Sequence, residues 1–71
     1  MKRGNMAAER VRRSMNIGDI AREIGVSSNS YSRWENCETA PSSENLIKLS
    51  EYFGCDPDYL LAKTEEYTHG V

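Results

Sequence analysis

Apolar residues between positions 17 and 36 recur at helical spacing, in two groups separated by a glycine. They are Ile20, Ala21, Ile24, Val26, Tyr31 and Trp34. Gly25 lies between the groups, and glycine takes the left-handed conformation that ends a helix without steric cost. Ser27 then offers a side-chain oxygen that can cap the next helix. The pattern predicts one helix over about 17–24 and another from about Ser28 to Asn36, joined by a tight turn.

The residues before this pair predict a first helix from about Asn5 to Met15. Its arginines are expected outside, and its partly inward residues are Met6, Ala7, Val11 and Met15. Asn16 follows this helix, and its side chain can cap the helix that begins at residue 17.

Two further helices are predicted after Pro41. Ser42 or Ser43 can cap the first of them, and Gly54 ends it. Its expected inward stripe is Leu46, Ile47, Leu49, Ser50 and Phe53. Asp56 as N-cap and Pro57 at the first helical position begin a short last helix, whose apolar residues are Tyr59, Leu60 and Leu61. We therefore expect an all-α fold of five helices.

Length and composition indicate a single small domain. The chain has 71 residues, of which 38% are hydrophobic and 28% charged. We expect one domain over 1–71, with a core over about 5–62 and a polar tail over 63–71. No apolar run approaches the roughly 20 residues of a membrane span, and the N-terminus lacks the apolar region of a secretory signal. These features favour a cytoplasmic protein without a membrane partner.

The residues that usually carry chemistry are sparse. Cys37 and Cys55 lie far apart without a second cysteine or histidine at ligand spacing, so we expect two reduced thiols and no metal site. The single histidine, His69, lies in the polar tail. Nothing pairs a nucleophile with a base, and neither a cofactor nor a small-molecule ligand is evident. We therefore expect a protein that is not an enzyme.

Charge is distributed unevenly along the chain. The net charge is −2, but residues 1–35 carry seven basic and four acidic residues, or +3, whereas residues 36–71 carry two and seven, or −5. The basic half contains the predicted helix pair, which suits contact with a polyanion. The low total charge argues for few phosphate contacts.

Taken together, these elements follow one motif. Its residues are Arg10, Ala21, Gly25–Val26–Ser27, Ser32–Arg33–Trp34–Glu35–Asn36, Pro41, Leu46, Phe53–Gly54–Cys55 and Asp58–Tyr59–Leu60–Leu61. In these residues the chain resembles the Cro/C1-type (XRE-like) helix-turn-helix DNA-binding family of phage repressors and bacterial regulators. The resemblance covers about residues 5–62. It implies a lambda-repressor-like domain with a helix-turn-helix at its second and third helices.

The function implied by the resemblance is sequence-specific regulation of transcription, with repressor-like character and a bacterial or phage origin. The third helix would read the major groove of double-stranded DNA, and two copies would pair on adjacent half-sites as a homodimer. Tyr31 and Trp34 are expected in the core rather than as stacking platforms for bases.

The resemblance also implies roles for single residues. Arg10 and Glu35 correspond to a structural ion pair between the first and third helices. The expected base readers are Ser28, Asn29, Ser32 and Arg33, because asparagine pairs with adenine and arginine with guanine. The expected phosphate-contacting positions are Asn16, Ile17, Ser27 and Asn36, aided by backbone N–H groups at helix starts.

Four positions depart from the family pattern. Ile17 replaces a glutamine that contacts the DNA backbone in many relatives, and an isoleucine side chain cannot form that hydrogen bond. Cys37 replaces a glycine, and we expect Asn36 to take up the resulting strain. Glu38 and Ala40 replace basic residues and are expected to face a phosphate. These departures keep an alternative open: a protein-interaction adaptor, such as an antitoxin-like or anti-repressor partner, with weak or no DNA binding.

Overall fold

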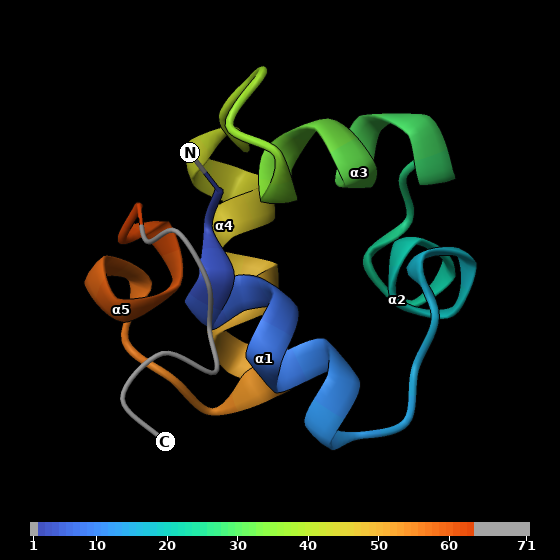
Figure 1. The fold of residues 1–71 in the computed structure, drawn as a ribbon, viewed down its shortest axis with the longest axis horizontal. Coiled ribbons are helices and arrows are strands. Elements are labelled where there is room, and N and C mark those ends of the chain that lie inside the picture. The colour runs from blue at the N-terminus through green and yellow to red at the C-terminus, as the bar shows by residue number, and fades with distance from the viewer. Residues whose placement is uncertain (1, 64–71) are drawn as a thin grey trace.

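The computed structural model describes residues 2–63, whose regular elements are five α-helices (Figure 1). They are α1 (Gly4–Arg12), α2 (Ile17–Ile24), α3 (Ser28–Glu35), α4 (Ser43–Phe53) and α5 (Pro57–Leu61). The predicted all-α class is confirmed. Residues 64–71, most of the expected polar tail, lie outside the described part.

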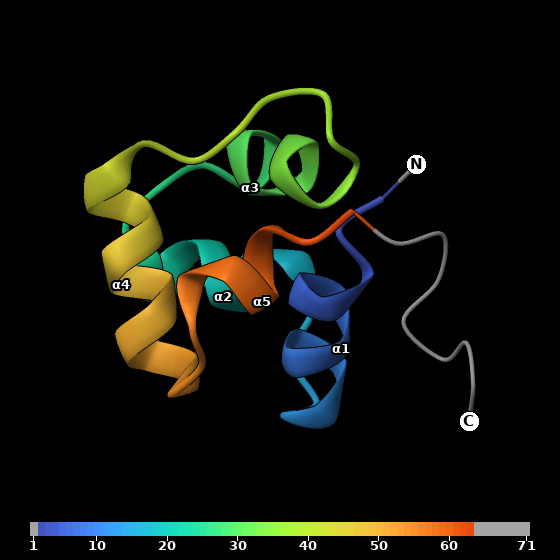
Figure 2. The same ribbon diagram turned by 90° about the vertical axis from the view of Figure 1, so that its left-hand side faces the viewer.

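The helices surround one apolar core. It is formed by Met6, Ile20, Ala21, Ile24, Tyr31, Trp34, Leu49, Phe53 and Leu60, and Met15, Ile17, Val26 and Cys55 pack against it. In both ribbon views α3 lies across one end of the molecule, and the C-terminal ends of α1 and α4 lie at the other (Figures 1 and 2). The core therefore supports the inner side of α3 and leaves its other side open.

The helix boundaries follow the predicted cap residues. The Asn16 side chain accepts a hydrogen bond from the Asp19 backbone N–H, and the Asp19 side chain accepts one from the Asn16 N–H, which completes a capping box. Ser27 caps α3, and Ser42, not Ser43, caps α4. Asp56 stands at the N-cap of α5, although its side chain makes no capping hydrogen bond.

The first helix is shorter than expected. It ends at Arg12, and Ser14 takes a left-handed conformation with φ 57°. This turn returns the chain toward the core, so the Met15 N–H donates to the carbonyl of Arg10 at 3.1 Å. The prediction that the helix reaches Met15 was wrong.

Two side chains expected inside are exposed. Val11 is 44% exposed and Ile47 55%, because each lies off the stripe of its helix that contacts the core. On α4 the buried positions are Leu49 and Phe53, four residues apart, and Ile47 falls to one side of them. Tyr59 is also exposed and directs its hydroxyl to Glu9. Within residues 2–63, no helix combines the length and the hydropathy that crossing a membrane requires.

Candidate nucleic-acid interface

A tight turn joins α2 to α3. Gly25 has φ 90°, and the N–H groups of Gly25 and Val26 both donate to the carbonyl of Ala21, at 2.8 and 2.9 Å. A Cβ at Gly25 would meet no atom within 4 Å, so only the backbone conformation demands glycine there. The turn thus fixes the direction in which α3 leaves α2.

The inner side of α3 is locked into the core. Tyr31 and Trp34 are buried and pack edge to face, with ring centroids 5.7 Å apart and an interplanar angle of 68°. This confirms that both rings belong to the core. Because a helix cannot rotate once such large side chains are buried, the opposite side of α3 is presented to solvent.

The expected base readers occupy that outer side. Ser28, Asn29 and Arg33 are exposed and Ser32 is half-buried. Asn29 and Arg33 are four residues apart, as are Ser28 and Ser32, so the four form two adjacent rows. The surface can donate and accept hydrogen bonds along about one and a half helical turns. Asparagine, arginine and serine side chains are of the kind that contact base edges in a major groove.

The N-terminal ends of α2 and α3 lie close together beside this surface. A Cβ placed on Gly18 would be 3.4 Å from Asn16 Oδ1 and 3.6 Å from Ser28 Oγ. Both helix ends present backbone N–H groups, which favour anions. Three of the positions expected to contact phosphate, Asn16, Ile17 and Ser27, therefore lie at two neighbouring helix N-termini, whereas Asn36 lies at the C-terminal end of α3.

The four residues expected to contact phosphate differ in whether their side chains already form hydrogen bonds within the domain. The Asn16 oxygen is engaged in capping, and the Ser27 hydroxyl both accepts from the Ser30 N–H and donates to Ser30 Oγ. Ile17 is half-buried and packs against the core, and its side chain offers no hydrogen bond. Asn36 is exposed, and its side-chain nitrogen lies 3.5 Å from Ser32 Oγ.

The ion pair expected between Arg10 and Glu35 is present. Arg10 Nε donates to Glu35 Oε2 at 2.8 Å and Nη2 to Oε1 at 3.2 Å, while Nη1 donates to the Met15 carbonyl at 3.0 Å. The two side chains are only 16% and 9% exposed. Hydrogen bonding to Glu35 raises the pKa of Arg10. The pair connects α1 to the last turn of α3.

Asn36 does not take up the strain assigned to it. It has φ −87°, an ordinary value, whereas Cys37 itself adopts the left-handed conformation with φ 63°. That expectation was therefore wrong. The turn at Cys37 allows the N–H groups of Glu38 and Thr39 to donate to the carbonyl of Arg33, at 2.9 and 3.4 Å. These hydrogen bonds compensate for the unfavourable conformation of the cysteine.

The structure adds Arg3, which the sequence did not single out. Arg3 is buried, its Nη1 donates to the carbonyls of Trp34 and Thr39, and its backbone N–H donates to the Glu35 carbonyl at 2.7 Å. The negative end of the α3 dipole favours this cation. A lone arginine near a terminus carries no sequence signal for such a role.

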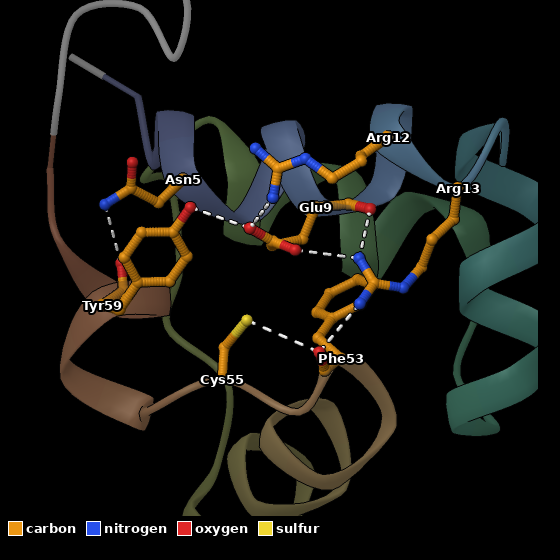
Figure 3. Close-up of polar contacts among 7 residues, drawn as sticks. All are labelled: Asn5, Glu9, Arg12, Arg13, Phe53, Cys55 and Tyr59. Carbon is orange, nitrogen blue, oxygen red and sulfur yellow. Dashed lines mark hydrogen bonds and ion pairs between the residues drawn. The ribbon is translucent and has the colours of Figure 1, made fainter.

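The carboxylate of Glu9, on α1, is buried and lies among the side chains of Arg12, Arg13 and Tyr59 (Figure 3). It accepts hydrogen bonds from Arg12, from Arg13 Nη1 at 2.9 Å and from the Tyr59 hydroxyl at 2.8 Å. Arg13 also donates to the carbonyl of Phe53 and lies 4.9 Å from the centre of its ring. The cluster joins α1 to α4 and α5 and therefore supports the fold rather than the outer side of α3.

Comparison with known proteins identifies the domain. The model of the helix-turn-helix family matches residues 6–60. The chain belongs to the Cro/C1-type helix-turn-helix family. Within this family, the curated repressor protein C2 of Salmonella phage P22 is 48% identical over 42 residues, which are 59% of this chain and 19% of that protein. The chain thus matches about a fifth of the length of that relative.

Solved structures of the P22 c2 repressor share the fold of this helix-turn-helix domain. One is the crystal structure of that repressor in complex with a synthetic operator, with a TM-score of 0.76, 37% identity, and coverage of 86% of this chain and 94% of that one. Another is the solution structure of its DNA-binding domain, with a TM-score of 0.71, 33% identity, and coverage of 94% and 95%.

The thiols and acids of this helix-turn-helix domain form no metal centre within residues 2–63. No group of three histidine, cysteine, aspartate or glutamate side chains gathers there. Cys37 and Cys55 are both free and half-buried. His69 lies outside the described residues.

Proposed function

We propose that this protein is a sequence-specific DNA-binding regulator of transcription, repressor-like and of bacterial or phage origin, which reads the major groove with α3. The observation that carries this proposal is the fixed presentation of α3: Tyr31 and Trp34 anchor one side, and Asn29 and Arg33 stand on the other. The likeness to a repressor solved on its operator supports it. We infer a binding protein rather than an enzyme.

In this proposal the residues on the outer side of α3 contact different bases. Asn29 pairs with an adenine and Arg33 with a guanine, and Ser28 and Ser32 adjust to neighbouring bases. The helix starts at Asn16 and Ser27 hold phosphates, chiefly through backbone N–H groups since the two side-chain oxygens accept capping bonds. The backbone of Ile17 and the side chain of Asn36 complete the contact.

We also infer that two copies act together on a two-fold symmetric operator, since one such domain covers a short site. A protein that binds bacterial operators works where the DNA is, in the cytoplasm. The arrangement calls for no cofactor.

Selection of bound sequences from a random pool of double-stranded DNA tests the proposal. Enrichment of a two-fold symmetric motif is expected. Titration of the same protein at two salt concentrations separates the regulator from the adaptor, because phosphate contacts weaken as salt rises. Absence of an enriched motif, together with equal binding at both salt concentrations, would reject the regulator and favour the adaptor.

A further inference from the structure

An acidic residue lies against the strongest of the expected base readers. The Oε1 atom of Glu38 is 3.9 Å from the Nε atom of Arg33, and both side chains are more than half exposed. The distance is within the range of an ion pair but too long for a hydrogen bond. The ion pair of Arg33 with Glu38 is therefore made at Nε rather than at the two terminal Nη groups.

The backbone fixes this approach. Cys37 turns the chain back at φ 63°, and the Glu38 N–H donates to the carbonyl of Arg33 itself at 2.9 Å. Arg3 holds the next carbonyl, that of Thr39, at 2.9 Å. The backbone of Glu38 is thus held at the end of α3, and only its side-chain rotamers can vary.

Stability alone does not account for a carboxylate at this place. An exposed ion pair contributes little to folding, and an acidic residue at the C-terminal end of a helix is unfavourably placed relative to the helix dipole. DNA changes the situation, because its phosphates would compete with Glu38 for Arg33 and would be repelled by the carboxylate.

We propose that Glu38 is a specificity-determining residue that acts through Arg33. Its charge attracts the guanidinium at Nε, leaves the Nη groups to contact guanine, and offsets the charge that Arg33 presents to phosphates. The bidentate contact with guanine O6 and N7 survives this restraint, because it needs only the free side of the guanidinium. Contact with a phosphate is weakened more, because the Glu38 carboxylate repels the full negative charge of the phosphate, whereas guanine O6 and N7 carry only partial charges. The inference rests on the proposed function. It adds to the same site a residue, Glu38, that increases the preference for the operator over other DNA.

Glu38→Gln tests the proposal, because it keeps the shape and removes the charge. Dissociation constants are measured on the selected operator and on the same operator with the guanine read by Arg33 replaced, over a series of salt concentrations. We expect tighter binding to the altered DNA by about fivefold, little change on the operator, and a salt dependence steeper by about one unit. The preference for the operator should fall by the same factor of about five.

Two matched variants test whether Glu38 acts through Arg33 rather than through the net charge of the protein. Glu51→Gln removes an equal charge near the C-terminal end of α4, the end that lies away from α3 (Figure 2), and should leave the preference unchanged. In an Arg33→Ala background, Glu38→Gln should shift both DNAs equally. All three sites are exposed, and a thermal unfolding curve checks that each variant is folded.

The outcomes separate this inference from the proposed function. Equal tightening on both DNAs by Glu38→Gln in the presence of Arg33 would overturn the role of Glu38 while leaving a sequence-specific regulator intact. A wild-type protein with no preference for any DNA would overturn the proposed function, and the role of Glu38 with it.

Discussion

The carboxylate of Glu9 is buried against two arginines, and its environment makes folding depend on pH. Burial by itself would raise the pKa of Glu9, but hydrogen bonds from Arg13, Tyr59 and Arg12 outweigh it and lower the pKa from 4.5 to about 2. The ionised form is thus favoured by folding. Its contribution to stability is complete above the unfolded pKa and is lost as the pH falls through about 2.

Glu9→Gln should therefore destabilise the domain at neutral pH but not in strong acid. The shift in pKa corresponds to an upper limit of roughly 3 kcal/mol in the free energy of unfolding. Urea unfolding of both proteins between about pH 7 and pH 2 measures the difference, which should disappear at the acid end. A difference that stays constant with pH would show that packing, not charge, explains the loss. Glu51→Gln serves as the exposed control.

Arg10→Met should cost several kcal/mol of stability, because it leaves the Glu35 carboxylate buried without its cation. Breaking one partner of a buried pair costs roughly 3 kcal/mol. Arg22→Met is the matched control, since Arg22 pairs with Asp19 at 3.6 Å with its side chain 77% exposed, and it should cost less than about 1 kcal/mol. Denaturant unfolding compares the two. If Arg10 contacts phosphate instead, its loss would flatten the salt dependence of DNA binding while stability stayed near wild type.

At the scale of single elements, the loop after α3 holds a non-glycine residue in the left-handed conformation. Cys37→Gly should stabilise the domain by about 0.5–1 kcal/mol, because glycine adopts φ 63° without the steric cost of a Cβ. Gly54→Ala gives the reverse test. Gly54 has φ 68°, and a Cβ added there would meet nothing within 4 Å. The substitution should therefore cost about 1 kcal/mol of stability, purely through the backbone conformation. Both changes appear in thermal unfolding. A destabilised Cys37→Gly would mean that the half-buried thiol contributes more by packing than its backbone costs.

The outer side of α3 gives a second prediction at this scale. Arg33→Ala should abolish the preference for the selected operator and leave weak, salt-sensitive binding to any DNA, since the phosphate contacts come from other residues. Competition assays with operator and unrelated DNA measure the ratio. Lys48→Ala, which removes an equal charge from an exposed position on α4, should preserve this ratio. Unchanged discrimination by Arg33→Ala would remove Arg33 from the base readers.

The elements themselves could be predicted because their apolar spacing and caps are local. Asn16, Gly25, Ser27 and Gly54 act through neighbours within four residues. The conformation of Cys37 depends on hydrogen bonds that return to the carbonyl of Arg33, which no local preference reveals.

Other contacts were beyond sequence reasoning for the same reason. Arg3 donates a hydrogen bond to Trp34, which lies 31 residues away in the sequence, and Tyr59 donates one to Glu9, which lies 50 residues away. The exposure of the outer residues of α3 could be predicted, because Tyr31 and Trp34 were expected in the core. The ion pair between Arg33 and Glu38 could not be predicted, because it depends on how the chain turns after α3.

At the scale of the whole molecule, the proposed function predicts binding in pairs. A DNA with both half-sites should bind two copies with a steep isotherm, and a DNA with one half-site should bind one copy more weakly by at least about tenfold. Analytical ultracentrifugation of the complexes gives the stoichiometry. Binding of single copies with equal affinity to both DNAs would argue against the dimer.

The contacts of Arg3 have a consequence for how the domain opens. They join the first residues of the chain to the main chain of Trp34, Glu35 and Thr39. In native-state fluctuations, the end of α3 and the loop that carries Glu38 therefore cannot separate from the core unless the start of the chain detaches as well. Residues that do not touch the outer side of α3 thus share its opening free energy, and a change at the start of the chain can alter the stability of the surface that carries Arg33.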